Sequence, residues 1–225
     1  MSGDSERVDS GSADADAGAD RADRADRVDP DRLPPEIREA VPDWDDEYLD
    51  RVGDRLMYGY DLEKDYRLDG ERWDLYGEMR VRNEKQFLHP ALSYADHEAE
   101  EYLFARREQG VTIRELERLV ERGHDVADER VDPDEEHYGT DVTFALVTDA
   151  IPDDVREFVE GFRDRTLLKF GYYGHYDVNL IVVAPDAEAI VASEAADAAE
   201  AFTLWEDVSE EREGFLSRFA RKFWT

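Results

Sequence analysis

Hydrophobic and polar side chains alternate with a period of two in the segment ERWDLYGEMRVR, residues 71–82. One side of the alternation is apolar and consists of Trp73, Leu75, Gly77, Met79 and Val81. A period of two with one apolar face predicts a half-buried strand. Residues 98–107 alternate less regularly and predict a second strand, with a helical turn over residues 99–103 as the alternative. Pro90 disfavours helical backbone at His89 between them, so we expect an antiparallel hairpin with a long connecting loop.

Two later segments are apolar at almost every position. Residues 141–148 contain VTFALV, and residues 176–184 contain VNLIVV. A run that is apolar on both faces predicts a central strand that is covered on both sides. We therefore expect two buried strands in the second half of the chain.

A period near 3.6 predicts helices between and around these strands. The first covers about residues 43–58, and the second covers residues 112–126, where Thr112 and Glu115 form a capping box. The third begins at Pro152, a residue favoured in the first helical turn, and its buried side extends to Leu167. The alanine-rich segment 187–202 predicts a helix in its second half, and residues 205–224 predict a last amphipathic helix.

These segments together predict an α+β domain. Their order is helix, strand, strand, helix, strand, helix, strand, and then one or two helices. Strands that are joined through helices become parallel neighbours in one sheet. We expect a mixed, mainly parallel sheet of about four strands, with the N-terminal hairpin as its antiparallel member and helices packed on both faces.

The length of 225 residues suits one domain with a tail. Residues 1–32 are rich in Asp, Ala and Ser, so we expect a disordered acidic tail before a single domain at residues 33–225. The absence of cysteine excludes a disulfide framework, a zinc–thiolate site and a thiol nucleophile. No apolar run approaches the ~18 residues of a membrane span, and no N-terminal signal segment is present. These features predict a cytoplasmic protein.

The charge of the chain is strongly negative, with 59 acidic residues against 28 basic ones and a net charge of −31. An acidic surface for cationic partners is one interpretation. Adaptation to a cytoplasm at molar salt is the other, because the Debye length there falls to about 3 Å and high charge preserves solubility. The basic residues include only four lysines, which favours the second interpretation. Nucleic-acid binding is not expected, because no basic stripe is present to neutralise phosphates.

The loop between the first two strands carries the first candidate site. His89, Tyr94 and His97 lie in HPALSYADHE, beside Asp96 and Glu100. Imidazole and carboxylate are metal ligands, which makes a metal-assisted hydrolase an alternative function. The spacing of the two histidines matches no compact metal motif. We therefore expect no metal or cofactor and interpret the loop as a contact surface.

The turn FGYYGHY at residues 170–176 carries the second candidate site. Tyr172, Tyr173 and His175 stand between flexible glycines and can bind a ligand by stacking. The glycines do not have the spacing of a phosphate-binding loop. The alternative is a purely structural role, in which the tyrosines of the turn cover the edge of the sheet.

The C-terminal segment GFLSRFARKFWT is locally basic and amphipathic. Phe215, Phe219 and Phe223 lie opposite Arg218, Arg221 and Lys222. Such a segment can bind a protein partner or the surface of a membrane, or it can dock on the acidic body of its own chain.

Three pieces of the sequence, YDLEKD, HPALSYADHE and YLFARR, resemble a family of uncharacterised proteins from halophilic archaea, a domain of unknown function. The resemblance covers about residues 44–207. It implies a cytoplasmic haloarchaeal protein with no assigned activity, so no functional residue is transferred. The chain also has no nucleophile elbow, no phosphate-binding loop and no kinase motifs. The sequence leaves enzymatic activity undecided and favours a non-enzymatic binding or interaction domain.

Overall fold

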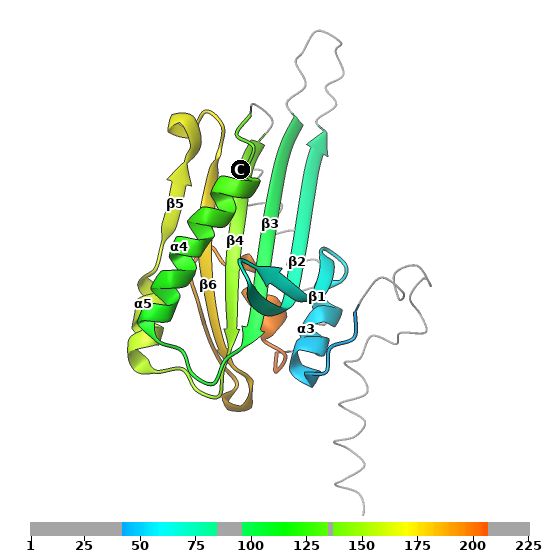
Figure 1. Cartoon of the computed structure of the whole chain (residues 1–225), viewed down its shortest axis with the longest axis vertical. Helices are drawn as coiled ribbons and strands as arrows, with labels where there is room; N and C mark the ends of the chain where they lie inside the picture. Colours follow the sequence, from blue (N-terminus) through cyan, green and yellow to red (C-terminus); the bar gives the residue numbers. More distant parts are fainter. Residues whose placement is uncertain (1–41, 85–95, 135–136, 207–225) are drawn as a thin grey trace, which may run out of the picture. The chain divides into compact units, whose positions relative to one another are not determined.

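The computed structural model describes residues 42–84, 96–134 and 137–206 (Figure 1). Its helices are α3 (Glu47–Leu56), α4 (Ile113–Arg130) and α5 (Asp153–Gly161), with 3-10 turns η2 (Leu168–Gly171), η3 (Pro185–Ala187) and η4 (Asp197–Phe202). Its strands are β1 (Asp61–Leu68), β2 (Glu71–Glu84), β3 (Asp96–Arg107), β4 (His137–Val147), β5 (Asp164–Leu167), β6 (His175–Ala184) and β7 (Ala189–Ala192).

The described residues form one seven-stranded mixed sheet. The order of the strands is β1-β2-β3-β4-β6-β5, and β7 also pairs with β6. The pairs β3–β4 and β4–β6 are parallel, and the other four pairs are antiparallel. Since β4 occupies one edge of β6, the short strands β5 and β7 follow one another along its other edge.

One face of the sheet is covered by α4, which crosses β4 and β6 (Figure 1). Leu116, Leu119 and Val126 of α4 lie in a buried cluster with Trp73, Phe104 and Phe144 of the strands, among others. The helix can lie close to the sheet because residue 123 is glycine. A Cβ atom there would lie 2.7 Å from a methyl group of Val178 on β6.

The other face carries a second apolar cluster. The short helix α3 contributes Leu49, Val52 and Leu56, and η4 contributes Ala198 and Phe202. Arg55 of α3 donates hydrogen bonds to the carbonyl oxygens of Glu200 and Thr203, so side-chain contacts join α3 to the end of the described chain. This face also contains the polar groups that are described below.

Several elements confirm the predictions from periodicity. The antiparallel pairing of β2 with β3 is the predicted hairpin, and the predicted central strands are β4 and β6. The helix α4 begins after the predicted cap Thr112, whose hydroxyl accepts a hydrogen bond from the N–H of Glu115 at 3.3 Å. This helix runs to Arg130 rather than ending near Val126.

The predicted fold class is wrong. The sheet has seven strands rather than about four, and most pairs are antiparallel rather than parallel. The strand β1 was hidden because five of its eight residues are charged, although its exposure alternates along the chain. The strands β5 and β7 have four residues each, too few to establish a period of two.

The helix predicted in the second half of residues 187–202 forms only as the short 3-10 turn η4. This segment begins with strand β7, which pairs with β6, and ends with the short 3-10 turn η4. Its alanines favour a helix locally, but the free edge of β6 offers hydrogen bonds to an extended segment. Most of the helix predicted at residues 205–224 lies outside the described residues, as does the whole N-terminal tail.

Candidate functional site

Three acidic side chains form a row across the middle of the sheet. Glu101 on β3 pairs with Asp141 on β4, and Asp141 pairs with Asp177 on β6. All three are buried, with exposed fractions of at most 3%. Adjacent strands lie about 4.8 Å apart, so opposed residues hold their side chains close together on one face. We call Glu101, Asp141 and Asp177 the buried acidic row. Their carboxyl groups lie together on one face of the sheet, beneath the elements that cover it.

The inner end of the buried acidic row is held by hydroxyl groups. Tyr60 donates a hydrogen bond to Glu101 Oε2 at 2.7 Å, and Thr143 donates one to Glu101 Oε1 at 3.0 Å. Burial raises the pKa of Tyr60 well above its ordinary value, and the negative charges of Glu101, Asp141 and Asp197 raise it further. Glu101, Asp141 and Asp197 therefore all lie near the phenol group of Tyr60.

The outer end of the row meets an arginine from the edge strand β5. Arg165 donates two hydrogen bonds to Asp177, from Nε at 2.8 Å and from Nη2 at 2.7 Å. Hydrogen bonding to Asp177 raises the pKa of Arg165. Two parallel hydrogen bonds between a guanidinium group and a carboxylate fix the orientation of the ion pair as well as adding to its strength. The side chain of Arg165 is half exposed, so the Asp177 end of the row lies near the solvent.

A cavity of about 630 Å³ opens beside this ion pair. It lies between the end of α5, strands β5 and β6, and the segment between β7 and η4. We call it the β5–β6 cavity, and its lining residues are Phe162, Arg163, Asp164, Arg165, Asp177, Asn179, Ser193, Glu194, Ala195 and Asp197.

The wall of the β5–β6 cavity carries more negative than positive groups. Its four acidic residues face two arginines. Arg163 pairs with Glu194, and Arg165 pairs with Asp177. Asp164 lies 3.2 Å from Nε2 of His124, which belongs to α4. The excess of carboxylates gives the cavity a negative potential.

Two neutral polar side chains connect the cavity to the buried acidic row. Asn179 donates a hydrogen bond from Nδ2 to Asp141 at 3.2 Å, and its Oδ1 accepts one from Ser193 at 3.4 Å. The hydroxyl of Ser193 also accepts the N–H of Leu180 at 3.1 Å. Asn179 and Ser193 are both buried. These bonds fix donor and acceptor positions on the floor of the cavity.

The predicted tyrosine turn lies at one end of β6 and does not line the β5–β6 cavity. The side chain of Tyr172 is 84% exposed, and that of Tyr173 is partly buried. The carbonyl oxygen of Tyr173 lies 2.7 Å from Nδ1 of His137. His175 lies on β6, and its Nε2 is 3.9 Å from Asp177. His175 therefore lies close to the buried acidic row, whereas Tyr172 does not belong to it.

The predicted loop site cannot be placed in the same way. His89 and Tyr94 lie outside the described residues, and for His97 only the backbone is described, at the start of β3. Phe215, Phe219 and Phe223 of the C-terminal segment also lie outside them. The assignments of these residues to a contact site remain predictions.

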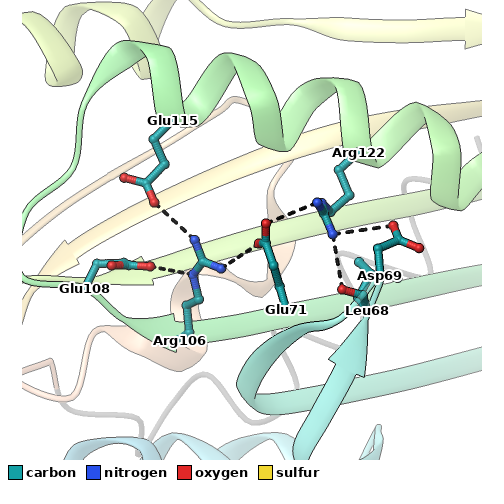
Figure 2. A network of polar contacts seen from close by, with 7 residues as sticks. All are labelled: Leu68, Asp69, Glu71, Arg106, Glu108, Glu115 and Arg122. Carbon is teal, nitrogen blue, oxygen red and sulfur yellow. Dashed lines mark hydrogen bonds and ion pairs between the residues drawn. The ribbon is translucent and has the colours of Figure 1, made fainter.

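The opposite face of the sheet contains a second polar network, which Figure 2 shows. Arg106 pairs with Glu71 at 2.9 Å, with Glu108 at 2.7 Å and with Glu115 of α4 at 3.1 Å. Arg122 of α4 pairs with the same Glu71 at 3.2 Å. These contacts join the β1–β2 turn and the end of β3 to α4. We assign them to the stability of the fold, because each charge has a partner within the network.

Sequence patterns did not reveal the buried acidic row. In the sequence, Asp141 and Asp177 directly precede the apolar runs of β4 and β6, and Glu101 lies in the irregular alternation of residues 98–107. One signal was present: acidic residues in strands whose other positions are apolar must be buried with partners or exposed at an edge. Only the pairing of the strands shows that the three acids are neighbours.

Two further observations concern the residues that the structure describes. Among them, no group of three or more His, Asp or Glu side chains is arranged to hold a metal ion. No helix in the described ranges is long and apolar enough to cross a membrane.

Comparison with known proteins gives one match. Residues 45–204 match a protein-family model that is described as a domain of unknown function. No curated protein and no solved structure matches the chain. The matched segment includes the buried acidic row and the whole lining of the β5–β6 cavity.

Proposed function

The chain belongs to the family described as domain of unknown function DUF8052, and because that description assigns no activity, we propose a function from the geometry. We propose that the domain is a non-enzymatic binding module. Its ligand is a small molecule with a positively charged amine or guanidinium group, which enters the β5–β6 cavity. The observation that carries this proposal is the excess of carboxylates around a cavity of about 630 Å³.

The dimensions of the cavity support a small ligand. Pockets for small molecules typically have volumes of ~300–1,000 Å³ and combine apolar walls with a few convergent polar groups. Phe162 and Ala195 supply apolar surface for a ligand stem, while Asn179 and Ser193 supply fixed hydrogen-bonding positions. A linear diamine or a guanidinium compound fits this chemistry.

The ion pair of Arg165 with Asp177 supports the choice of cation. The guanidinium group of Arg165 already binds Asp177 of the cavity wall through two hydrogen bonds. This pair shows that a carboxylate of the cavity wall binds a planar N–H donor with two hydrogen bonds. Aspartate and glutamate side chains bind such donors with charge-assisted hydrogen bonds.

Isothermal titration calorimetry with three probes that each contain a four-carbon chain tests the proposal. Agmatine carries two positive charges, butanediol none, and succinate two negative charges. We expect saturable binding of agmatine at one site, and no binding of butanediol or succinate. Equal binding of all three probes, or no binding of agmatine at a KCl concentration at which the domain is folded, would contradict the proposal.

A pair of matched variants assigns binding to the cavity. Ala195→Leu places a larger side chain in the lining without removing a charge, whereas Ala187→Leu makes the same change in the exposed turn η3. We expect at least a tenfold loss of agmatine affinity for the first variant, which corresponds to about 1.4 kcal/mol, and no loss for the second. Equal affinities of the two variants would show that agmatine binds elsewhere.

The composition supports a further part of the proposal, namely a cytoplasmic protein of a halophilic archaeon. The net charge of −31 and the scarcity of lysine suit molar salt, where charge repulsion is screened. The measurement is the unfolding midpoint as a function of KCl concentration. We expect it to rise continuously from dilute buffer to molar KCl, and a midpoint that is independent of salt would contradict the salt adaptation.

Three predictions that concern residues not described, or described by their backbone alone, remain proposals with their own tests. A metal-assisted hydrolase at His89 and His97 requires stoichiometric metal in purified protein and its loss in His89→Ala. A partner contact through Phe215, Phe219 and Phe223 requires that Phe219→Ser abolish binding of that partner. Limited proteolysis tests the disordered tail, which should be removed before residues 33–225 are cut.

A further inference from the structure

The ion pair of Arg165 with Asp177 joins two side chains of very different exposure. The side chain of Asp177 is 2% exposed, whereas that of Arg165 is 52% exposed. The two residues are opposite one another in the antiparallel pairing of β5 with β6, and β5 is an edge strand of four residues. Arg165 thus supplies a partly exposed charge to a buried acid, and both residues line the β5–β6 cavity.

The two partners differ in what they lose when the pair opens. An arginine side chain that is half exposed can turn into the solvent and become hydrated. A buried carboxylate cannot remain without a partner, because its charge has lost its own hydration. Asp141, which is directly opposite Asp177 on β4, adds a second buried acid at the same place. The pair therefore opens only when another cation takes the place of Arg165 on Asp177.

The geometry of the contact selects a guanidinium group over an ammonium group. Nε of Arg165 donates to Oδ1 of Asp177 at 2.8 Å, and Nη2 donates to Oδ2 at 2.7 Å. One planar cation thus satisfies both oxygens of the carboxylate. An ammonium group is a point charge without this fork, so it cannot form the same two parallel hydrogen bonds. The subsite on Asp177 is accordingly suited to a guanidinium group, and Arg165 occupies it in the structure.

The rest of the cavity wall suits the remainder of a guanidinium ligand. Phe162 and Ala195 offer apolar surface for its stem. Glu194 pairs with Arg163, but the two side chains are 69% and 65% exposed. An exposed ion pair contributes little to stability. Glu194 can therefore exchange Arg163 for a second positive group of the ligand.

We propose that Arg165 is an internal competitor of the ligand. The ligand carries a guanidinium group, which replaces that of Arg165 on Asp177 and displaces the arginine side chain toward the solvent. This inference rests on the proposed function, to which it adds the chemical class of the head group and the residue that limits the affinity. The exchange keeps one positive charge beside the buried acidic row, so the buried carboxylates are not left without a cation.

Competition and a fixed ion pair predict different effects of loosening Arg165. Under competition, the free energy of binding includes the cost of removing Arg165 from Asp177, so a weaker hold of this residue tightens the ligand. If Arg165 stays in place and only neutralises the row, a weaker hold cannot improve binding. Arg165→Lys separates the two cases, because lysine keeps the positive charge but gives up the two parallel hydrogen bonds of the guanidinium group.

Isothermal titration calorimetry of the full chain with agmatine tests the competition. All proteins are compared at one KCl concentration at which circular dichroism shows that they are folded. Arg165→Lys should bind agmatine about tenfold more tightly than wild type, the effect of one hydrogen bond to a charged group. Arg67→Lys makes the same change at an exposed residue of β1, at the opposite edge of the sheet, and should leave the affinity unchanged. An affinity of Arg165→Lys that is equal to or below that of wild type overturns the proposal.

Titration with 1,4-diaminobutane tests the head group, because this probe has the four-carbon chain and the two positive charges of agmatine but no guanidinium. Wild type should bind agmatine about tenfold more tightly than 1,4-diaminobutane, and equal affinities overturn the proposal. Loss of agmatine binding in Ala195→Leu without tighter binding in Arg165→Lys would leave the proposed function standing and refute the competition alone.

A rescue experiment tests the subsite on Asp177 independently of agmatine. Arg165→Ala removes the guanidinium group and should lower the midpoint of thermal unfolding, because Asp177 loses its ion-pair partner. Methylguanidinium chloride should raise the midpoint of this variant more than the same concentration of methylammonium chloride does, and should not do so for wild type. If Arg165→Ala does not fold alone, methylguanidinium should restore its folding. Equal effects of the two salts on the variant overturn the proposal, even where wild type binds agmatine.

Discussion

Asp141 on β4 and Asp177 on β6 occupy directly opposite positions in a parallel pair of strands, and both side chains are buried. Glu101 continues the row on β3. Like charges directly opposite in a sheet destabilise it by up to about 1 kcal/mol per pair. The fold tolerates this arrangement next to the β5–β6 cavity, where we propose that a cationic ligand binds.

Asp141→Asn should stabilise the domain and weaken the binding of the ligand. The substitution removes the central charge of the buried acidic row and keeps the oxygen that accepts the amide of Asn179. We expect the free energy of unfolding to rise by about 0.5–1 kcal/mol, measured by urea denaturation at fixed KCl, and the affinity for agmatine to fall. Asp186→Asn in the exposed turn η3 is the control. A loss of stability for Asp141→Asn would mean that the fold requires this charge.

Arg106→Met should destabilise the domain strongly. Arg106 joins three carboxylates, its side chain is 13% exposed, and its guanidinium carbon lies 4.5 Å from the ring centroid of Trp73. The methionine retains apolar contact with the ring but leaves the carboxylates facing one another. We expect a loss of about 2–3 kcal/mol in urea denaturation, below the full cost of breaking a buried pair because Glu71 is partly exposed.

Arg80→Met supplies the comparison for Arg106. Arg80 pairs with Glu78 at 2.7 Å and with Glu100 at 3.2 Å, but its side chain is 57% exposed. Exposed ion pairs contribute at most about 1 kcal/mol. Similar losses for the two variants would show that the network in Figure 2 has no special role in the fold.

Gly123→Ala should loosen the packing of α4 on the sheet. The added Cβ atom would lie 2.7 Å and 2.9 Å from the two methyl groups of Val178 and 3.3 Å from the ring of Phe144. Overpacking of a buried contact costs about 1–3 kcal/mol, which outweighs the better helix propensity of alanine. Gly161→Ala at the end of α5 meets no atom within 4 Å and should leave the thermal midpoint nearly unchanged. Equal midpoints would contradict the close approach of helix and sheet.

Alkaline pH should unfold the domain more readily because of Tyr60. Burial and the carboxylate of Glu101 raise the pKa of this phenol well above its ordinary value of 10.0. Below pH 10 both the folded and the unfolded chain hold the proton. Above it only the unfolded chain releases the proton, so stability falls with rising pH by up to ~1.4 kcal/mol per pH unit.

The check is denaturation of wild type and Tyr60→Phe from neutral to strongly alkaline pH. Tyr60→Phe should be less stable at neutral pH, because Glu101 loses a hydrogen bond. Its stability should then fall less steeply above pH 10. Tyr48, Tyr76 and Tyr102 also have pKa values raised chiefly by burial, so a residual fall remains in the variant. Identical slopes would exclude Tyr60 as a source of the alkaline sensitivity.

The elements that periodicity predicted are those whose stability is local or whose pattern is long. The strand β2 has an uninterrupted apolar face from Trp73 to Val81, and α4 begins at a capping box. The strands β1, β5 and β7 were missed because an edge strand is stabilised by hydrogen bonds to its neighbour. Such bonds leave little trace in the choice of side chains, and in β7 the alanines even favour a helix.

The candidate site shows the same division. The tyrosine turn was found because three tyrosines and two glycines are adjacent in the sequence, and the structure gives it an exposed phenylalanine at its apex. The lining of the β5–β6 cavity was missed, since its members come from the residues after α5, from β5 and β6, and from the segment after β7.

The sequence by itself determined the charge of the chain, the two central strands, the hairpin of β2 with β3 and the helix α4, because these follow from composition and from contacts between near neighbours in the chain. Only the tertiary structure decided that Glu101, Asp141 and Asp177 form one row and that Arg165 binds at its end. The register of strands far apart in the sequence depends on packing of the whole sheet, and a shift of one residue would turn every one of these side chains to the other face.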